Sequence, residues 1–166
     1  MIDYNKVLNP AVKEIKPSGI RKFFDIAETM EDVISLGVGE PDFPTPWQIR
    51  SAGIKSLEES KTRYTSNRGL GKLRETIAEY TKRKCGVAYE PEEEILVTVG
   101  GSEAIDMSIR ALVASGEEVI IPQPSYVCYE PIVKLVGGIP VIIETKAENQ
   151  FKLTPEELKN AITPKT

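Results

Sequence analysis

The chain has 166 residues, the length of one ordinary domain, and its 40% hydrophobic and 28% charged residues favour a packed core over disorder. Its 21 basic and 25 acidic residues give a net charge of −4, which argues against a nucleic-acid partner because such binders neutralise phosphates with clustered positive charge. There is no histidine, which excludes histidine general bases and nearly all catalytic zinc sites, so we expect no metal site.

The two cysteines, Cys85 and Cys128, match no metal-ligand spacing. We interpret them as buried small residues of a protein from a reducing compartment. No apolar run approaches the roughly 20 residues of a membrane-spanning helix, and the first ten residues do not resemble a signal peptide. We therefore expect a soluble, cytoplasmic protein with no membrane partner.

The N-terminal part of the chain has the pattern of an arm followed by local structure. The first 17 residues are irregular and punctuated by prolines, and Ser18 would cap a helix with apolar residues at helical spacing. A short apolar strand over 33–36 then runs into a loop over 37–44 that is rich in glycine and proline.

Two longer helices are expected next. Thr45, followed by a proline and then by Gln48, predicts a capping box that opens a helix ending near residue 60. Apolar residues on one face predict another helix over 71–84, with Gly86 as its stop signal.

From residue 95 onward, short strands alternate with helices. Strands are expected over 95–99, 119–121 and 140–143, and helices over 102–115, 125–136 and 155–162, the last opened by a capping box at Thr154. This alternation is typical of a mostly parallel sheet covered by helices on both faces. Three strands are too few to complete such a sheet, so we expect the chain to stop in the middle of its fold.

The strongest local motif is the turn formed by Gly100, Gly101 and Ser102, between the 95–99 strand and the following helix. The glycines let backbone N–H groups approach a ligand closely, and the helix N-terminus carries roughly half a positive charge, which suits a phosphate. Ser102 would add a hydroxyl or only cap the helix. A tight strand-to-helix turn with no ligand is the alternative.

Two other segments could contribute to a site. Tyr126 follows the 119–121 strand at its C-terminal end, the edge where open parallel sheets bind ligands. Its ring could form a flat wall for an aromatic ligand, or fill the core. The loop that runs from Tyr64 through Arg68 to Arg74 could serve anions, although solvated surface arginines are the commoner case.

Taken in order, the segments 35–46, 64–74, 98–105 and 122–126 resemble the N-terminal part of class I/II aminotransferases. These are pyridoxal-phosphate enzymes of the aspartate aminotransferase superfamily, fold type I. The resemblance implies an α/β fold that is an incomplete N-terminal part of the large cofactor-binding domain, a mostly parallel sheet flanked by helices with an N-terminal arm. It divides the chain into an arm and small-domain segment over 1–45 and the first part of the large domain over 46–166.

The resemblance also assigns cofactor contacts residue by residue. Gly100, Gly101 and Ser102 match the turn that holds the phosphate of pyridoxal 5′-phosphate, and Tyr126 matches the aromatic residue stacked on its pyridine ring. Tyr64 matches the tyrosine that reaches the phosphate of the neighbouring subunit's cofactor, which implies a homodimer.

The substrate and catalytic residues are expected as follows. Gly39 matches the loop glycine whose backbone contacts the substrate carboxylate, with a purely conformational glycine as the alternative, and Arg74 is expected to be structural. The family's Schiff-base lysine lies much further along, and neither Lys159 nor Lys165 stands in its context. We therefore expect no catalytic residue in this chain, with the lysine beyond residue 166, and no turnover by the chain alone.

The implied activity of the parent protein is transfer of an amino group between an amino acid and a 2-oxo acid. Two alternatives stay open. Another fold-type-I enzyme, such as a β-eliminating C–S lyase, is compatible because the motifs present do not set the reaction at Cα. A catalytically silent phosphate-binding fragment is the other.

Overall fold

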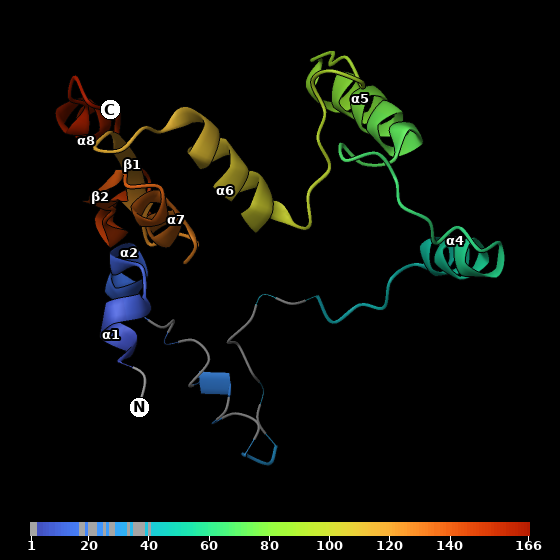
Figure 1. The fold of residues 1–166 in the computed structure, drawn as a ribbon, viewed down its shortest axis with the longest axis horizontal. Coiled ribbons are helices and arrows are strands. Elements are labelled where there is room, and N and C mark those ends of the chain that lie inside the picture. Colours follow the sequence, from blue (N-terminus) through green and yellow to red (C-terminus); the bar gives the residue numbers. More distant parts are fainter. Residues whose placement is uncertain are drawn as a thin grey trace. The chain divides into compact units, whose positions relative to one another are not determined.

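The computed structural model describes residues 3–16, 19, 23–24, 26, 29–32, 34, 39 and 41–166 (Figure 1). Its elements in chain order are α1 (Tyr4–Val7), α2 (Pro10–Glu14), α4 (Trp47–Glu58), α5 (Gly71–Cys85), α6 (Gly101–Leu112), β1 (Glu118–Gln123), α7 (Tyr129–Leu135), β2 (Ile139–Glu144), the 3-10 turn η1 (Ala147–Asn149) and α8 (Pro155–Ala161). The helix expected from Ser18 and the strand expected over 33–36 fall largely outside the described residues.

The chain divides into two compact units. One contains Met1–Arg21 together with Val99–Thr166, and the other contains Lys22–Thr98. The expected boundary between residues 45 and 46 stays a prediction.

The first unit is built on a parallel pair of strands. β1 and β2 run side by side with Glu118 opposite Ile139 and Gln123 opposite Glu144. Their valines and isoleucines suit a pleated, covered surface, and α7 makes the crossover that parallel strands need. α7 packs on both strands, α2 and α6 pack on α7, and α8 packs on β2 (Figure 1). Ile121 and Val133 are buried where α7 covers the sheet.

The second unit is held together by a buried arginine of α5. The Arg74 side chain is almost fully buried, and its Nη1 donates to the Pro91 carbonyl at 2.9 Å. Its Nη2 lies 3.1 Å from both carboxylate oxygens of Glu92. These bonds tie α5 to the segment after it, so Arg74 has the structural role expected of it.

The strand expected over 95–99 is absent from the structure, and the prediction was wrong. The Val97 N–H donates to the carbonyl of Arg68 at 3.0 Å, in the loop before α5. Gly69 permits this approach because its φ is +95° and a Cβ there would lie 2.6 Å from the Val97 Cβ. A strand requires a neighbour in a ladder, and the sheet formed by the described residues contains only β1 and β2.

Two helix starts also differ from expectation. The capping box predicted at Thr45 does not form, because the N-cap is Pro46, whose carbonyl accepts from the N–H groups of Ile49 and Arg50. α7 begins at Tyr129 instead of residue 125, since the residues after Pro124 form a loop before the helix.

Two predicted helix boundaries are confirmed. Gly86 ends α5 in the left-handed conformation, with φ of 72°, and the Thr154–Glu157 capping box opens α8, as predicted.

The cysteines were predicted to be buried, but Cys85, the last residue of α5, is exposed and Cys128 is partly exposed. None of the described helices is long and apolar enough to cross a membrane.

The Arg74 network gives a first prediction. Arg74→Ala should lower the free energy of unfolding by about 2–4 kcal/mol, near the low end for breaking a buried ion pair because Glu92 is largely exposed. Urea unfolding of the 166-residue chain measures it. Lys84→Ala, an exposed position on the same helix, is the control and should change the value by less than about 0.5 kcal/mol. Equal losses in both variants would contradict the assignment.

The capping box at the start of α8 gives a second prediction. Hydrogen bonds from the Thr154 backbone N–H and then its hydroxyl hold the pKa of Glu157 below its ordinary value. Because the folded-state pKa is depressed, this contribution to stability is present above the unfolded-state pKa and is lost as pH falls through the folded one. We expect the amide protection factors at the start of α8, measured against the intrinsic exchange rates at each pH, to fall on acidification through that range. Glu157→Gln should remove this pH dependence, and Glu156→Gln in the same turn should retain it.

Candidate functional site

The N-terminus of α6 forms the centre of the candidate site. Gly100 is its N-cap with φ of 84° and ψ of 167°, a conformation that L side chains rarely adopt, so glycine is required there. Gly101 opens the helix, and a Cβ built on either glycine would meet no atom within 4 Å. The first N–H groups of a helix have no partner within it, so this open, positive helix end can receive an anion.

A direct contact joins this helix end to the loop after β1. The hydroxyl oxygens of Ser102 and Tyr126 lie 3.3 Å apart, and either group can donate. The Tyr126 ring stays 55% exposed, and the Tyr129 ring packs against it edge-on with centroids 5.9 Å apart. Four of the predicted site residues therefore lie together: Gly100, Gly101, Ser102 and Tyr126. Tyr126 is not a core residue.

One contact at this helix end was missed from the sequence. The carboxylate of Glu103 accepts a hydrogen bond from the Val99 N–H, just before the N-cap. An acidic side chain in the first turn also interacts favourably with the helix dipole. A glutamate three residues after a cap position is a recognisable signal, and it could have been used here.

The other predicted site residues belong to the second unit. Tyr64 is fully exposed, and Gly39 is exposed with no atom within 4 Å of a Cβ built on it. Their expected contacts with a cofactor and a substrate stay predictions.

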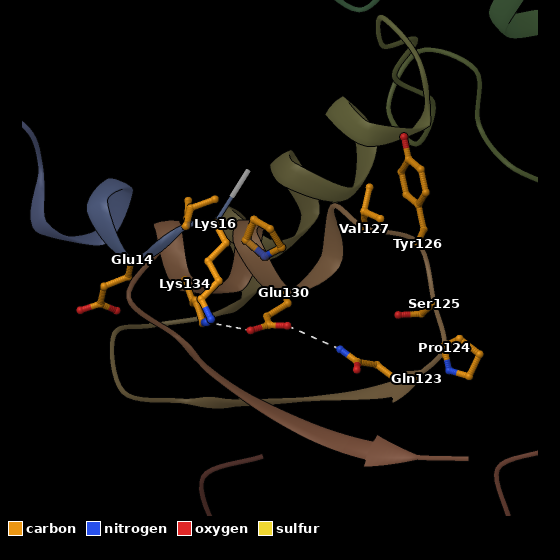
Figure 2. Close-up of a pocket in the computed structure, with 11 residues that line it drawn as sticks. Glu14, Lys16, Gln123, Pro124, Ser125, Tyr126, Val127, Glu130 and Lys134 are labelled. Atoms are coloured by element: carbon orange, nitrogen blue, oxygen red, sulfur yellow. Dashed lines mark hydrogen bonds and ion pairs between the residues drawn. The ribbon is translucent and has the colours of Figure 1, made fainter. Parts of the chain in front are cut away.

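A cavity of about 540 Å³ opens beside Tyr126 (Figure 2). Its walls come from the residues around the end of α2, the loop after β1, and one face of α7. On α7, Lys134 Nζ lies 2.7 Å from one carboxylate oxygen of Glu130, and the Gln123 side-chain amide lies 3.5 Å from the other. The spacing of Glu130 and Lys134 is a readable i, i+4 pair, but its place beside Tyr126 was not predicted.

The chain matches known proteins over nearly its whole length. The family model described as "Aminotransferase class I and II" covers residues 31–166. The "Putative aminotransferase YugH" of Bacillus subtilis is 55% identical over 96% of this chain and 41% of its own length. An "Aspartate aminotransferase" of Pyrococcus abyssi is 48% identical over 92% of this chain and 39% of its own.

A solved structure supports the same relationship. The aromatic aminotransferase from Pyrococcus horikoshii OT3 superposes with a TM-score of 0.78 at 45% identity, over 86% of this chain and 38% of that one. The expected fold class, part of a fold-type-I α/β domain, is thereby confirmed. The chain spans about two fifths of the length of these relatives. With its family motifs in order and matching relatives in both sequence and fold, the chain belongs to the class I and II aminotransferase family.

Proposed function

We propose that the protein containing this chain is a pyridoxal-phosphate-dependent aminotransferase, which moves an amino group between an amino acid and a 2-oxo acid. The observation that carries this proposal is the contact between Ser102 and Tyr126 at the N-terminus of α6. It combines a helix end suited to a phosphate with an exposed aromatic ring, the two features needed to hold this cofactor. The aminotransferase names of the relatives favour transamination over β-elimination, and over a silent phosphate-binding fragment.

The residues present fit the phosphate end of the cofactor. The donors at this helix end are the N–H groups of its first residues, Gly101 and Ser102, and the two hydroxyls of the contact pair, and together they suit an acceptor with several oxygens. Both glycines leave the space around the helix end clear of side chains. The acidic residue nearest to this turn in the sequence is Glu103, and its carboxylate accepts a hydrogen bond from the Val99 N–H.

In this proposal the chain's own residues bind the cofactor and orient it. The Ser102 hydroxyl and the helix end would hold the phosphate, and the Tyr126 ring would offer its face to the pyridine. Pyridoxal phosphate, when bound, supplies an electron sink for bonds broken at the Cα of the amino acid. No residue of this chain is assigned a proton-transfer role, and the catalytic lysine stays predicted beyond residue 166.

The remaining expectations extend the proposal. Tyr64 would serve the cofactor of a second subunit in a homodimer, and its complete exposure within its own unit leaves the side chain accessible to such a partner. Gly39 would offer its backbone to the substrate carboxylate. A cytoplasmic location is the compartment we expect.

The activity can be tested directly. The protein containing this chain, loaded with pyridoxal phosphate, should convert an amino acid to its 2-oxo acid only when a second 2-oxo acid is present as acceptor. Chromatography of both products measures the reaction. Release of ammonia without an acceptor would favour elimination, and no turnover with any of the twenty amino acids would overturn the proposal.

The phosphate site can be tested separately by a serine pair on α6. Ser102→Ala should weaken pyridoxal-phosphate binding roughly 10- to 100-fold, because a hydrogen bond to a charged group contributes about 1.5–3 kcal/mol. Fluorescence titration of the apoprotein gives the dissociation constants. Ser108→Ala is the matched control, since that hydroxyl donates to the Ala104 carbonyl within the same helix. Similar changes in both variants would speak against a phosphate contact at Ser102.

A further inference from the structure

Thr145 is a buried polar residue that the proposed cofactor contacts do not use. Among the residues that the structure describes, the buried polar side chains are those of Arg74 and Thr145, and Arg74 ties α5 to the segment after it. Burying a hydroxyl is unfavourable unless it has a hydrogen-bond partner. The Thr145 hydroxyl donates at 2.7 Å to the carbonyl of Gln123, the last residue of β1.

The Gln123 carbonyl is held by two donors of the same residue. It accepts the Thr145 N–H at 2.8 Å, which continues the parallel ladder one residue beyond β2, and it also accepts the Thr145 hydroxyl. A carbonyl oxygen has two lone pairs, so both bonds form together. The N–H bond is open to any residue except proline at this position, whereas the second bond requires a hydroxyl. Threonine suits that bond because its β-branched side chain is restricted at χ1.

This pair of bonds fixes one end of the loop that carries Tyr126. The loop begins directly after Gln123 (Figure 2), and at its other end the Tyr129 N–H donates to the Tyr126 carbonyl at 3.3 Å. The Tyr129 ring also packs edge-on against the Tyr126 ring. Because both ends of this short segment are held, the Tyr126 ring has few positions available. In the present one its hydroxyl meets that of Ser102.

We propose that Thr145 is a positioning residue for cofactor binding, which acts through the Tyr126 ring by holding the start of its loop with the hydroxyl-to-carbonyl bond. The inference rests on the proposed aminotransferase function and deepens it, because it adds a residue that contacts the loop instead of the proposed phosphate site. A binding residue is effective when supporting hydrogen bonds keep it close to its productive geometry. Without the hydroxyl the start of the loop shifts, and the ring spends less time facing the pyridine of pyridoxal phosphate.

Two substitutions at this position separate the hydroxyl from the shape of the side chain. In the protein containing this chain, Thr145→Val should weaken pyridoxal-phosphate binding about 3- to 10-fold, the loss expected for one hydrogen bond. Thr145→Ser keeps the hydroxyl and should stay within about twofold of the unsubstituted protein. Fluorescence titration of the apoprotein gives the dissociation constants.

Thr81→Val is the matched control, because the Thr81 hydroxyl also donates to backbone carbonyls but does so within α5. It should leave the affinity for pyridoxal phosphate unchanged. Equal losses in Thr145→Val and Thr81→Val, or no loss in Thr145→Val, would overturn the proposal.

A double-mutant cycle distinguishes positioning of the ring from a general loss of stability. Tyr126→Ala removes the ring, so adding Thr145→Val to it should weaken pyridoxal-phosphate binding by less than about 1.5-fold further, because residues that act through one another are non-additive. If the two losses are fully additive, Thr145 does not act through Tyr126 and the proposal is wrong.

A second readout needs no cofactor and separates this inference from the proposed function. With fluorine-labelled tyrosine in the apoprotein, the resonance of residue 126, assigned by its loss in Tyr126→Phe, should shift or broaden in Thr145→Val and keep its position in Thr145→Ser. If it does so but the unsubstituted protein neither binds pyridoxal phosphate nor transfers an amino group, the proposed function is wrong and the hold of Thr145 on the Tyr126 loop stands. If transamination occurs while neither the resonance nor the affinity depends on the Thr145 hydroxyl, the positioning role is wrong and the proposed function stands.

Discussion

The parallel ladder between β1 and β2 is the constraint on which the candidate site depends. Parallel pairing brings the carboxyl ends of both strands to one edge of the sheet, and the loop that carries Tyr126 leaves β1 there. The end of β1 is fastened by Thr145, whose N–H and hydroxyl both donate to the Gln123 carbonyl, at 2.8 and 2.7 Å. Because this bond pair lies immediately before the loop, it limits where the loop begins and so where the Tyr126 ring can lie.

α7 links the core of the first unit to its chemistry. Its buried face places Ile132 and Val133 against the sheet, which is the packing that holds the crossover in place. Its other side carries Glu130 and Lys134 into the wall of the cavity. Burial on one face and charge on another is the usual consequence of helical periodicity. Because α6 packs against the same helix, α7 supports both the helix that carries the candidate site and the wall of the cavity.

The second edge of β1 has no strand beside it among the described residues. The N–H of Glu118 donates to the Lys165 carbonyl at 2.8 Å, on the edge that β2 does not use. Beside it, an apolar hollow of about 190 Å³ is lined by β1 together with residues such as Ile105 and Ile109 of α6. Apolar residues in the 95–99 segment have the composition of a strand, but they form no ladder because strand identity depends on a partner.

Local sequence determined the features whose interactions are local. The capping box at Thr154, the left-handed Gly86 and the turn at Gly100 follow from side-chain and backbone chemistry within a few residues, and the order of the motifs was enough to indicate the family. Tertiary structure alone decided which segments became strands, where α7 begins, and that Lys16 lies in the same cavity as Glu130 and Tyr126. Those outcomes depend on contacts between residues far apart in the chain, and the periodicity of a single segment carries no information about such partners.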